Sequence, residues 1–305
     1  SIYLLEVQIL SAMKKLILKN GNKKRIFFKK NFGHNFRLRG IAIHICIILT
    51  IILLQLSCEK VVNINLNNAA KKYVIEGSIT NRPGDCKIKI TQTVNFSDPN
   101  IFAGVTDATV TVQDNDNPPI LLTQTVDGLY ESGDLNGAPG HTYTLKVKVG
   151  GHEFSAQSLM PEQVNFDSLY IEDFQGFGTT KKFADVVFTD PPGKGNAYRF
   201  IQVKNNQLNN GIFVLNDNFT DGRVNNTILA YFDSKDENMI KTGDTVSVEM
   251  LCIDPAVYQY WFGLQESSTG NSDNASPGNP VSNISGGALG YFSAHTYQIR
   301  TVITP

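Results

Sequence analysis

The sequence has few of the residues from which catalytic and metal-binding motifs are usually built. Its 305 residues include five histidines, four cysteines and one tryptophan. No histidine pair has the H-E-x-x-H spacing of a zinc hydrolase, and no glycine-rich run leads into the Lys-Ser/Thr of a phosphate-binding loop. Ser285, in "SGGALG", lacks the G-x-S-x-G arrangement of a nucleophile turn. We therefore expect a protein that is not an enzyme.

Long apolar runs are also scarce, and the one that is present lies near the start of the chain. Residues 41–56 read "IAIHICIILTIILLQL", preceded by ten basic residues and one acidic residue. A basic region, an apolar core and a small residue such as Ser57 are typical of a secretory signal. We expect residues 1–57 to be a signal peptide, with Met13 as the true start and residues 1–12 upstream of it. The alternative is an uncleaved membrane anchor, for which this run is short.

The end of the apolar run resembles the lipobox of bacterial lipoproteins. The stretch "LLQLSC" ends at Cys58, although Gln55 stands where Leu is commonest. The resemblance implies that the signal is cleaved before Cys58 and that this cysteine carries a covalent lipid. Each buried CH₂ of such a lipid contributes about 0.8 kcal/mol to membrane binding. We expect no other cofactor, and we expect residues 58–70 to form a polar tether.

Positive charge is scarce once the signal is removed. Residues 58–305 keep 17 basic and 27 acidic residues, a formal net charge of −10. A body of this charge repels nucleic-acid backbones and anionic lipid surfaces. Nucleic acid is therefore excluded as an expected partner, and membrane attachment has to come from the lipid.

Helical periodicity is nearly absent from the mature chain, whereas alternation with period two is frequent. Seven short segments with strand patterns lie between residues 72 and 158, and Asp127-Gly128 and Gly150-Gly151 mark tight turns between some of them. This spacing predicts an antiparallel β-sandwich over residues 71–160. The segment resembles immunoglobulin-like and transthyretin-like modules of envelope proteins, with "TVTV" at 109–112 and "GHTYTL" at 140–145.

We expect a domain boundary near Pro161, followed by a second β-rich domain over residues 161–305. Seven more strand patterns follow, the last at residues 295–303. One short helix is expected at about 254–267, because Asp254 can cap its start and Pro255 suits the first helical position. Val257, Trp261 and Leu264 would form its apolar face, with Trp261 in the core.

Two cysteines, Cys86 and Cys252, remain in the mature chain outside the lipidation site. An oxidising compartment would allow a disulfide between them, but two separately buried thiols are an equally open alternative. We expect no metal site. Asp217 and Asp221 in "NDNFTDG" are weak calcium candidates, because Phe219 stands at the third position, where an EF-hand loop requires an oxygen ligand.

The stretch "PGNPVSNISGGALGYFSAHT", residues 277–296, concentrates turn formers before an aromatic strand entry. We interpret it mainly as architecture that positions the last strand, with glycines that allow close backbone approach beside the preceding helix. The alternative is a docking loop, for which the candidate residues are Asn283, Gly286, Gly287, Tyr291 and Phe292.

This stretch, the helix segment "DPAVYQYWFGLQ", the entry "CEKVVNINL" and the strand "VIEGSIT" together resemble the DUF4249 family of Bacteroidetes envelope lipoproteins. The resemblance implies an outer-membrane lipoprotein, facing either the periplasm or the cell surface, whose genes commonly neighbour TonB-dependent receptors. It transfers no enzymatic residues. We therefore expect a lipid-anchored accessory or ligand-binding partner of such a receptor. The alternatives are an envelope hydrolase with a site near His295 or the Asp217/Asp221 loop, and a structural or adhesion protein.

Overall fold

The computed structural model describes residues 70–95, 98–176, 179–230, 239–268 and 279–305. The expected signal peptide, Cys58 and nearly all of the expected tether lie outside these residues. In the part that is described, no helix combines the length and the hydrophobicity needed to cross a membrane.

Strands form where apolar and polar residues alternate. In β7 (Thr142–Val149) every second side chain is buried, while Lys146 and Lys148 between them are exposed. The other strands of the first half are β1 (Tyr73–Thr80), β2 (Cys86–Gln92), β3 (Thr109–Asp114), β4 (Ile120–Leu121), β5 (Thr123–Val126), β6 (Leu129–Ser132) and β8 (His152–Leu159). All seven segments predicted from alternation are therefore strands, one of them split at Leu122 into β4 and β5.

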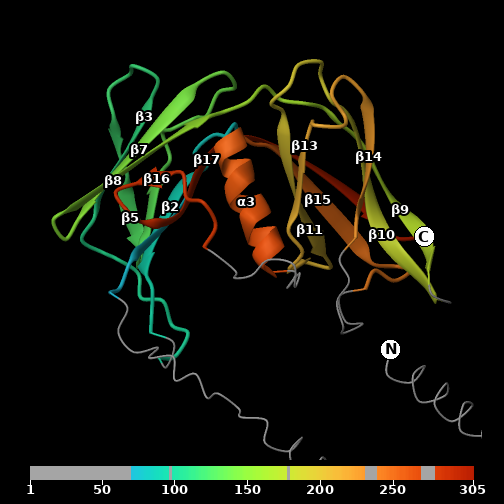
Figure 1. Ribbon diagram of the computed structural model, residues 1–305, viewed down its shortest axis with the longest axis horizontal. Helices are drawn as coiled ribbons and strands as arrows, with labels where there is room; N and C mark the ends of the chain where they lie inside the picture. The colour runs from blue at the N-terminus through green and yellow to red at the C-terminus, as the bar shows by residue number, and fades with distance from the viewer. Residues whose placement is uncertain (1–69, 96–97, 177–178, 231–238, 269–278) are drawn as a thin grey trace, which may run out of the picture. The chain divides into compact units, whose positions relative to one another are not determined.

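These strands form two sheets that enclose one apolar core (Figure 1). One is a five-stranded sheet in the order β16-β8-β7-β3-β4, where β16 (Ile284–Ser285) comes from the far end of the chain. The other contains β1, β2, β6 and β5. Ile75 and Ile88 from the second sheet meet Val112 and Leu145 from the first in the core. The predicted β-sandwich is confirmed.

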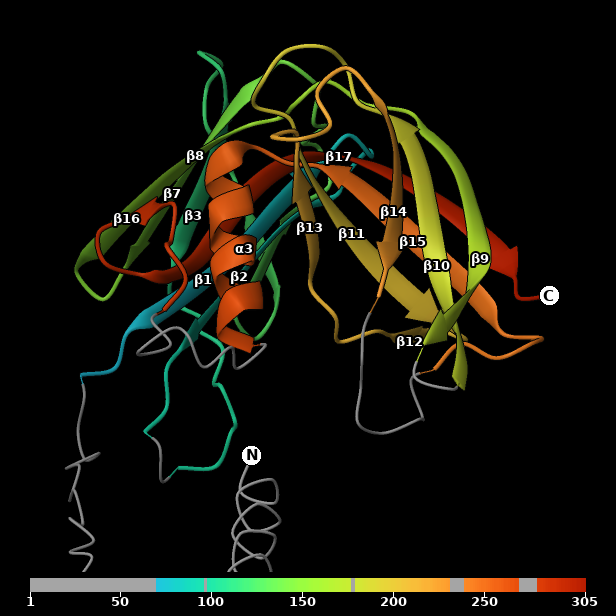
Figure 2. The same ribbon diagram turned by 45° about the vertical axis from the view of Figure 1, so that its right-hand side comes forward.

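The second half is also built from strands, as the sequence predicted. They are β9 (Phe166–Gly176), β10 (Thr179–Thr189), β11 (Ala197–Lys204), β12 (Gln207–Leu208), β13 (Phe213–Asn216), β14 (Val224–Leu229), β15 (Thr245–Cys252) and β17 (Leu289–Ile303). β14, β10 and β9 form a three-stranded sheet, which shares an apolar core with β11 and β15 (Figure 2). Phe188 and Phe200 pack against each other in this core, with ring centroids 5.9 Å apart.

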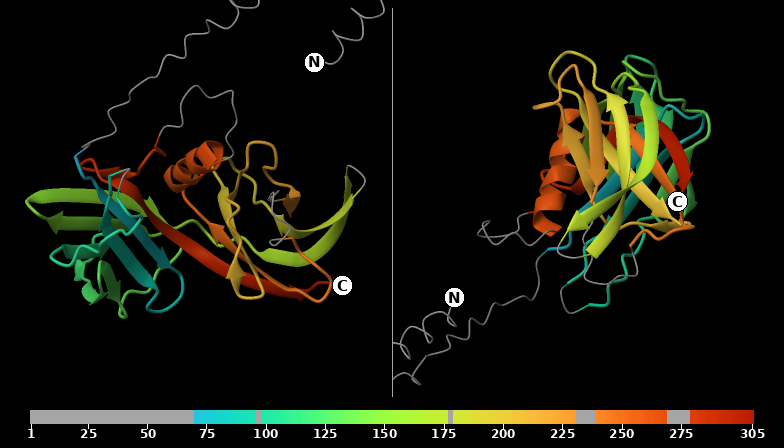
Figure 3. Two further views of the ribbon diagram at one scale, coloured as in Figure 1. Left: turned by 90° about the horizontal axis from the view of Figure 1, so that it is seen from below. Right: turned by 90° about the vertical axis from the view of Figure 1, so that its right-hand side faces the viewer.

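The long strand β17 joins some of the strands of each half into one nine-stranded sheet (Figure 3). Its first part pairs in parallel with β1, from Val74↔Leu289 to Thr80↔His295. Its second part pairs antiparallel with β15, from Cys252↔Thr296 to Thr245↔Ile303. Every strand pair described within residues 71–160 is antiparallel, as expected. The parallel pair was not anticipated, because the other neighbour of β1 comes from the C-terminal end and runs in the same direction.

The described residues all belong to one compact unit, Leu66–Pro305. The boundary expected near Pro161 stays a prediction. The apolar core around Phe188 contains only residues that follow Pro161, whereas the core around Ile75 also includes Ile284 and Phe292 from the C-terminal end of the chain. Strand pairing also crosses Pro161, because β16 and β17 both pair with strands of the first half.

The predicted helix is α3 (Pro255–Ser268), and it begins where the sequence indicated. The carboxylate Oδ1 of Asp254 accepts a hydrogen bond of 2.9 Å from the amide of Val257, which satisfies one of the free donors of the first turn. Val257 is fully buried. Val257 belongs to a small apolar cluster that also contains Ala197, Leu251, Ile253 and Tyr258. Trp261 packs against this cluster but is only partly buried, and the guanidinium of Arg199 lies 3.3 Å from its ring centroid. Trp261 thus combines apolar packing with a cation contact.

Candidate functional site

A polar concavity of about 740 Å³ lies on the outer face of the five-stranded sheet. The same alternation that buries Leu145 directs Thr144 and Lys146 of β7 to this face. Ser155 and Gln157 of β8 line it in the same way. Hydroxyl, amide and ammonium groups therefore project from a hydrogen-bonded sheet, which is a rigid base for a binding surface.

The concavity is closed on one side by the loop that precedes β17. Asn283 fastens this loop through two hydrogen bonds to Phe292: its Nδ2 donates to the carbonyl at 2.7 Å, and its Oδ1 accepts from the amide at 2.9 Å. Ser285 pairs with Ser155 in the sheet, and its hydroxyl donates to the Ser155 carbonyl at 2.9 Å. Asn283 and Ser285 both line the concavity.

The glycines of this loop permit close backbone contact, as the sequence indicated. A Cβ on Gly286 would lie 2.5 Å from the carbonyl oxygen of Glu153, and Gly286 has a φ of 92°. The contact is with β8, whereas we expected it beside the helix.

Only some of the five candidate docking residues are accessible to a partner. Gly286 and Gly287 are exposed and Asn283 is half-buried. Tyr291 is half-buried and packs against Tyr260, with ring centroids 4.9 Å apart. Phe292 is fully buried in the sandwich core and cannot contact a partner, since its position on β17 faces inward.

A second polar cluster lies between two loops of the other half. Asp190 directly follows β10, while Asp217 and Asp221 lie in the loop after β13. One carboxylate oxygen from each lies within 4.8 Å of the others. Asp190 and Asp217 are buried, and Asp221 is half-buried. Sequence reasoning identified Asp217 and Asp221 but missed Asp190, because no local spacing connects residues so far apart in the chain.

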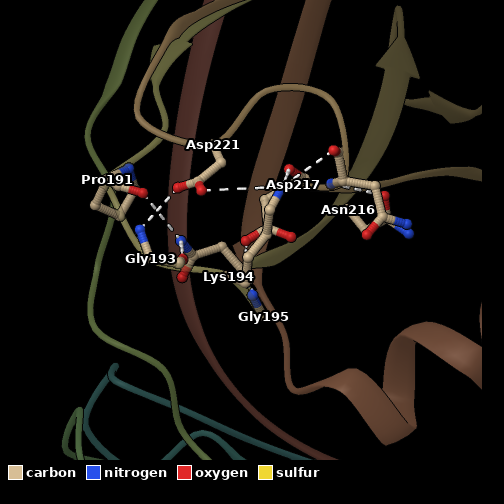
Figure 4. A network of polar contacts seen from close by, with 9 residues as sticks. Pro191, Gly193, Lys194, Gly195, Asn216, Asp217 and Asp221 are labelled. Carbon is tan, nitrogen blue, oxygen red and sulfur yellow. Dashed lines mark hydrogen bonds and ion pairs between the residues drawn. The ribbon is translucent and has the colours of Figure 1, made fainter.

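Backbone amides hold two of these carboxylates in place (Figure 4). Asp217 Oδ2 accepts hydrogen bonds from the amides of Gly195 at 2.7 Å and Asn196 at 3.0 Å. Asp221 Oδ1 accepts one from Gly193 at 2.7 Å. The turn "PPGKGN" therefore presents consecutive donors to the second loop.

Asp190 is the most deeply buried of the three. Its Oδ1 accepts a hydrogen bond from the hydroxyl of Tyr198, while its Oδ2 has no hydrogen-bond partner of normal geometry in the described part of the chain. Burial raises the pKa of the Asp190 carboxyl, and the charges of Asp217 and Asp221 raise it further, against the lowering effect of the Tyr198 hydroxyl and the Gly222 amide.

A family model described as a domain of unknown function, DUF4249, matches residues 59–301. The chain belongs to the DUF4249 family. No curated protein matches the chain. The match covers both apolar cores and α3, so the concavity and the acidic cluster both lie inside the DUF4249 domain.

His295 of the DUF4249 domain is a core residue. It is 8 % exposed, and its Nδ1 lies 2.9 Å from the hydroxyl of Ser293 on the same strand. Burial lowers the pKa of His295 to about 4, helped by the charge of Arg199, so the ring is neutral at pH 7. The loop of Asp217 and Asp221 instead bonds the 193–196 turn. The two places considered for a hydrolase site thus have separate sets of partners.

A buried polar contact also ties the helix start to the first half of the domain. The hydroxyl of Ser158 on β8 donates to Asp254 Oδ2 and accepts from the amide of Ala294 at 2.9 Å. Burial raises the pKa of Asp254, whereas the hydrogen bonds from Ser158 and the helix amides lower it. This arrangement fixes α3 against β8 and β17.

Cys86 and Cys252 are both free and buried. Cys86 belongs to the sandwich core and Cys252 to the core of the other half. The possible disulfide is therefore not formed in the structure, because each thiol packs in its own apolar cluster. This agrees with the alternative of two separately buried thiols.

Proposed function

We propose that this DUF4249 protein is a non-enzymatic envelope lipoprotein that acts as an accessory or ligand-binding partner of a TonB-dependent outer-membrane receptor. The observation that carries the proposal is the order of features in the sequence: a basic region, an apolar core, the lipobox-like "LLQLSC", and then the family match from residue 59 onwards. The folded unit follows a short polar stretch after Cys58.

The physical role of the lipid follows from the charge of the body. Residues 58–305 carry a formal net charge of −10, which disfavours adsorption on anionic lipids. Several acyl chains on Cys58 would overcome this repulsion, since two lipid chains already give stable anchoring. The tether between the lipid and β1 would leave the body able to meet an integral membrane partner.

The polar concavity is the surface that best suits such a partner. It offers Lys146, Gln157 and hydroxyl groups on a sheet whose rim loop is fixed by Asn283. Non-obligate interfaces are about as polar as the rest of a protein surface and include direct hydrogen bonds, and a rigid surface limits the entropy lost on binding. We therefore place the receptor contact on this face.

The anchoring part is tested by mass spectrometry of the mature amino terminus and by membrane sedimentation. We expect a diacylated terminus at Cys58 and a protein that leaves the membrane fraction in Cys58→Ala. A variant of unchanged mass that still sediments with membranes would refute the anchor.

The partner contact is tested by site-specific photo-crosslinking in whole cells. A photo-reactive residue at Gln157, which lines the concavity, should give a crosslink to an outer-membrane receptor. The matched control is Val126 on β5, which is 60 % exposed and does not line the concavity. Equal crosslinking from both positions, or none from Gln157, would count against this surface.

A further inference from the structure

We infer that Asp190, Asp217 and Asp221 form a Ca²⁺ site that links the turn of residues 190–196 to the loop of residues 217–222. The inference departs from the expectation of no metal and does not depend on the proposed function. It rests on the convergence of three carboxylates and on a buried oxygen without a partner.

The unpartnered oxygen is the decisive observation. Asp190 has 0 % exposure, and its Oδ2 has no hydrogen bond of normal geometry from any described residue, although the nearby Gly222 amide lowers the pKa of the carboxyl. A buried carboxylate oxygen that has lost its water without gaining a donor is strongly unfavourable. The hydroxyl of Thr220, between Asp217 and Asp221 in the chain, is also buried and has no hydrogen-bond partner among the residues that the structure describes. A cation at this position would provide the missing interaction for the Asp190 oxygen, and the Thr220 hydroxyl is a further neutral oxygen ligand.

The three carboxylate ligands favour a hard cation. All three ligands are carboxylates, whereas zinc and copper sites typically include histidine or cysteine. Calcium holds oxygen ligands at about 2.4 Å, so two ligands on opposite sides of the ion are about 4.8 Å apart. The carboxylate oxygens lie within that separation. Magnesium usually keeps several waters in a strict octahedral shell with one or two carboxylates, whereas three protein carboxylates suit the larger and more flexible shell of calcium.

Lys194 supplies only part of the positive charge that the cluster needs. Its ammonium donates to the carbonyls of Asp217 at 2.9 Å and Asn218 at 3.0 Å, and it lies 3.9 Å from Asp221 Oδ2. It gives the buried Asp190 Oδ2 no hydrogen bond. One ammonium cannot balance three converging carboxylates.

The site differs from an EF-hand, which explains why the loop motif alone did not predict it. Phe219 stands at the position that would require an oxygen ligand, and it is 90 % exposed. The third carboxylate comes from Asp190, in a different loop. Amides of the 193–196 turn orient Asp217 and Asp221, in the way that outer-shell groups orient metal ligands.

The test uses the mature chain after removal of metal with a chelator, titrated with CaCl₂ by calorimetry and followed by thermal unfolding. We expect one Ca²⁺ per chain, with a Kd of roughly 10⁻⁴ to 10⁻³ M as in extracellular modules. Saturating Ca²⁺ should raise the Tm by about 3–6 °C. Asp190→Asn and Asp221→Asn should each weaken binding at least tenfold and abolish the shift.

Asp244→Asn is the matched control, because Asp244 is also a loop aspartate whose carboxylate accepts a backbone amide hydrogen bond, from Lys241 at 2.8 Å. It should leave Ca²⁺ binding unchanged. Asp221→Asn keeps the test decisive if Asp190→Asn does not fold, since Asp221 is only half-buried. Lack of binding in the parent chain at 10 mM Ca²⁺, or binding in both ligand variants as tight as in the parent chain, would overturn the inference. Binding that appears only in Lys194→Met would also overturn it, because the ammonium would then be the resident cation.

Discussion

Gly290 and Gly287 provide a matched pair for measuring what the parallel pairing of β1 and β17 requires. Both have positive φ, 97° and 89° respectively. A Cβ on Gly290 would lie 2.0 Å from the carbonyl oxygen of Ile75, its partner in the register, whereas a Cβ on Gly287 would have no atom within 4 Å. Substitution by Ala therefore adds the same backbone strain at both positions and a steric clash at only one.

The magnitudes follow from these contacts. A non-glycine residue in the left-handed region costs about 1–2 kcal/mol, which is the whole effect expected for Gly287→Ala. At Gly290 the clash is with backbone and can only be relieved by moving β1 away from β17. Lengthening two or three ladder hydrogen bonds, each contributing about 1 kcal/mol, adds roughly 2–3 kcal/mol. We expect Gly290→Ala to reduce the free energy of unfolding by about 4 kcal/mol.

The assay is equilibrium unfolding in urea, supported by thermal unfolding. At about 2–4 °C per kcal/mol for a domain of this size, the Tm should fall by about 10 °C for Gly290→Ala and by about 4 °C for Gly287→Ala. If the two variants lose equal stability, the close contact between Gly290 and Ile75 does not exist in solution and the assigned register of β17 is wrong.

Three other predictions concern buried groups. Because the pKa of His295 is about 4 in the folded state and 6.5 in the unfolded state, the unfolded chain binds more protons between these values, so stability falls as the pH is lowered. Relative to His295→Gln, the parent chain should lose about 2 kcal/mol between pH 7.5 and pH 5 in urea unfolding; parallel pH profiles would contradict this. Asp254→Ala should cost about 2 kcal/mol in the same assay, since it removes the helix cap and the acceptor of Ser158, while Asp254→Asn should cost less; equal losses would argue against the cap. Burial raises the pKa of Cys86 to about 12 and also raises that of Cys252, so both thiols should resist alkylation until the chain is denatured and should then react without a reductant, as mass spectrometry would show; a requirement for reductant would reveal a disulfide.

The strands and the helix could be predicted from the sequence because their determinants are local. Alternation in β7 and the cap formed by Asp254 depend on residues within a few positions of one another. Very short strands were not predicted: β12 and β16 have two residues each, too few for a pattern. The pairing partners of each strand could not be predicted from the sequence either, since no residue near β1 indicates that β17 lies beside it.

The candidate site residues also fall into two groups, those that the sequence indicated and those that only the tertiary structure brought together. Asp217 and Asp221 were noticed because they share one loop, and Asn283 because it stands among turn formers. That Asp190 completes the cluster, that Phe292 is buried and that Cys86 and Cys252 occupy different cores was decided by tertiary packing. The physical reason is that periodicity and capping act over a few residues, whereas the neighbours of a side chain across a sheet or between loops depend on how the whole chain closes on itself.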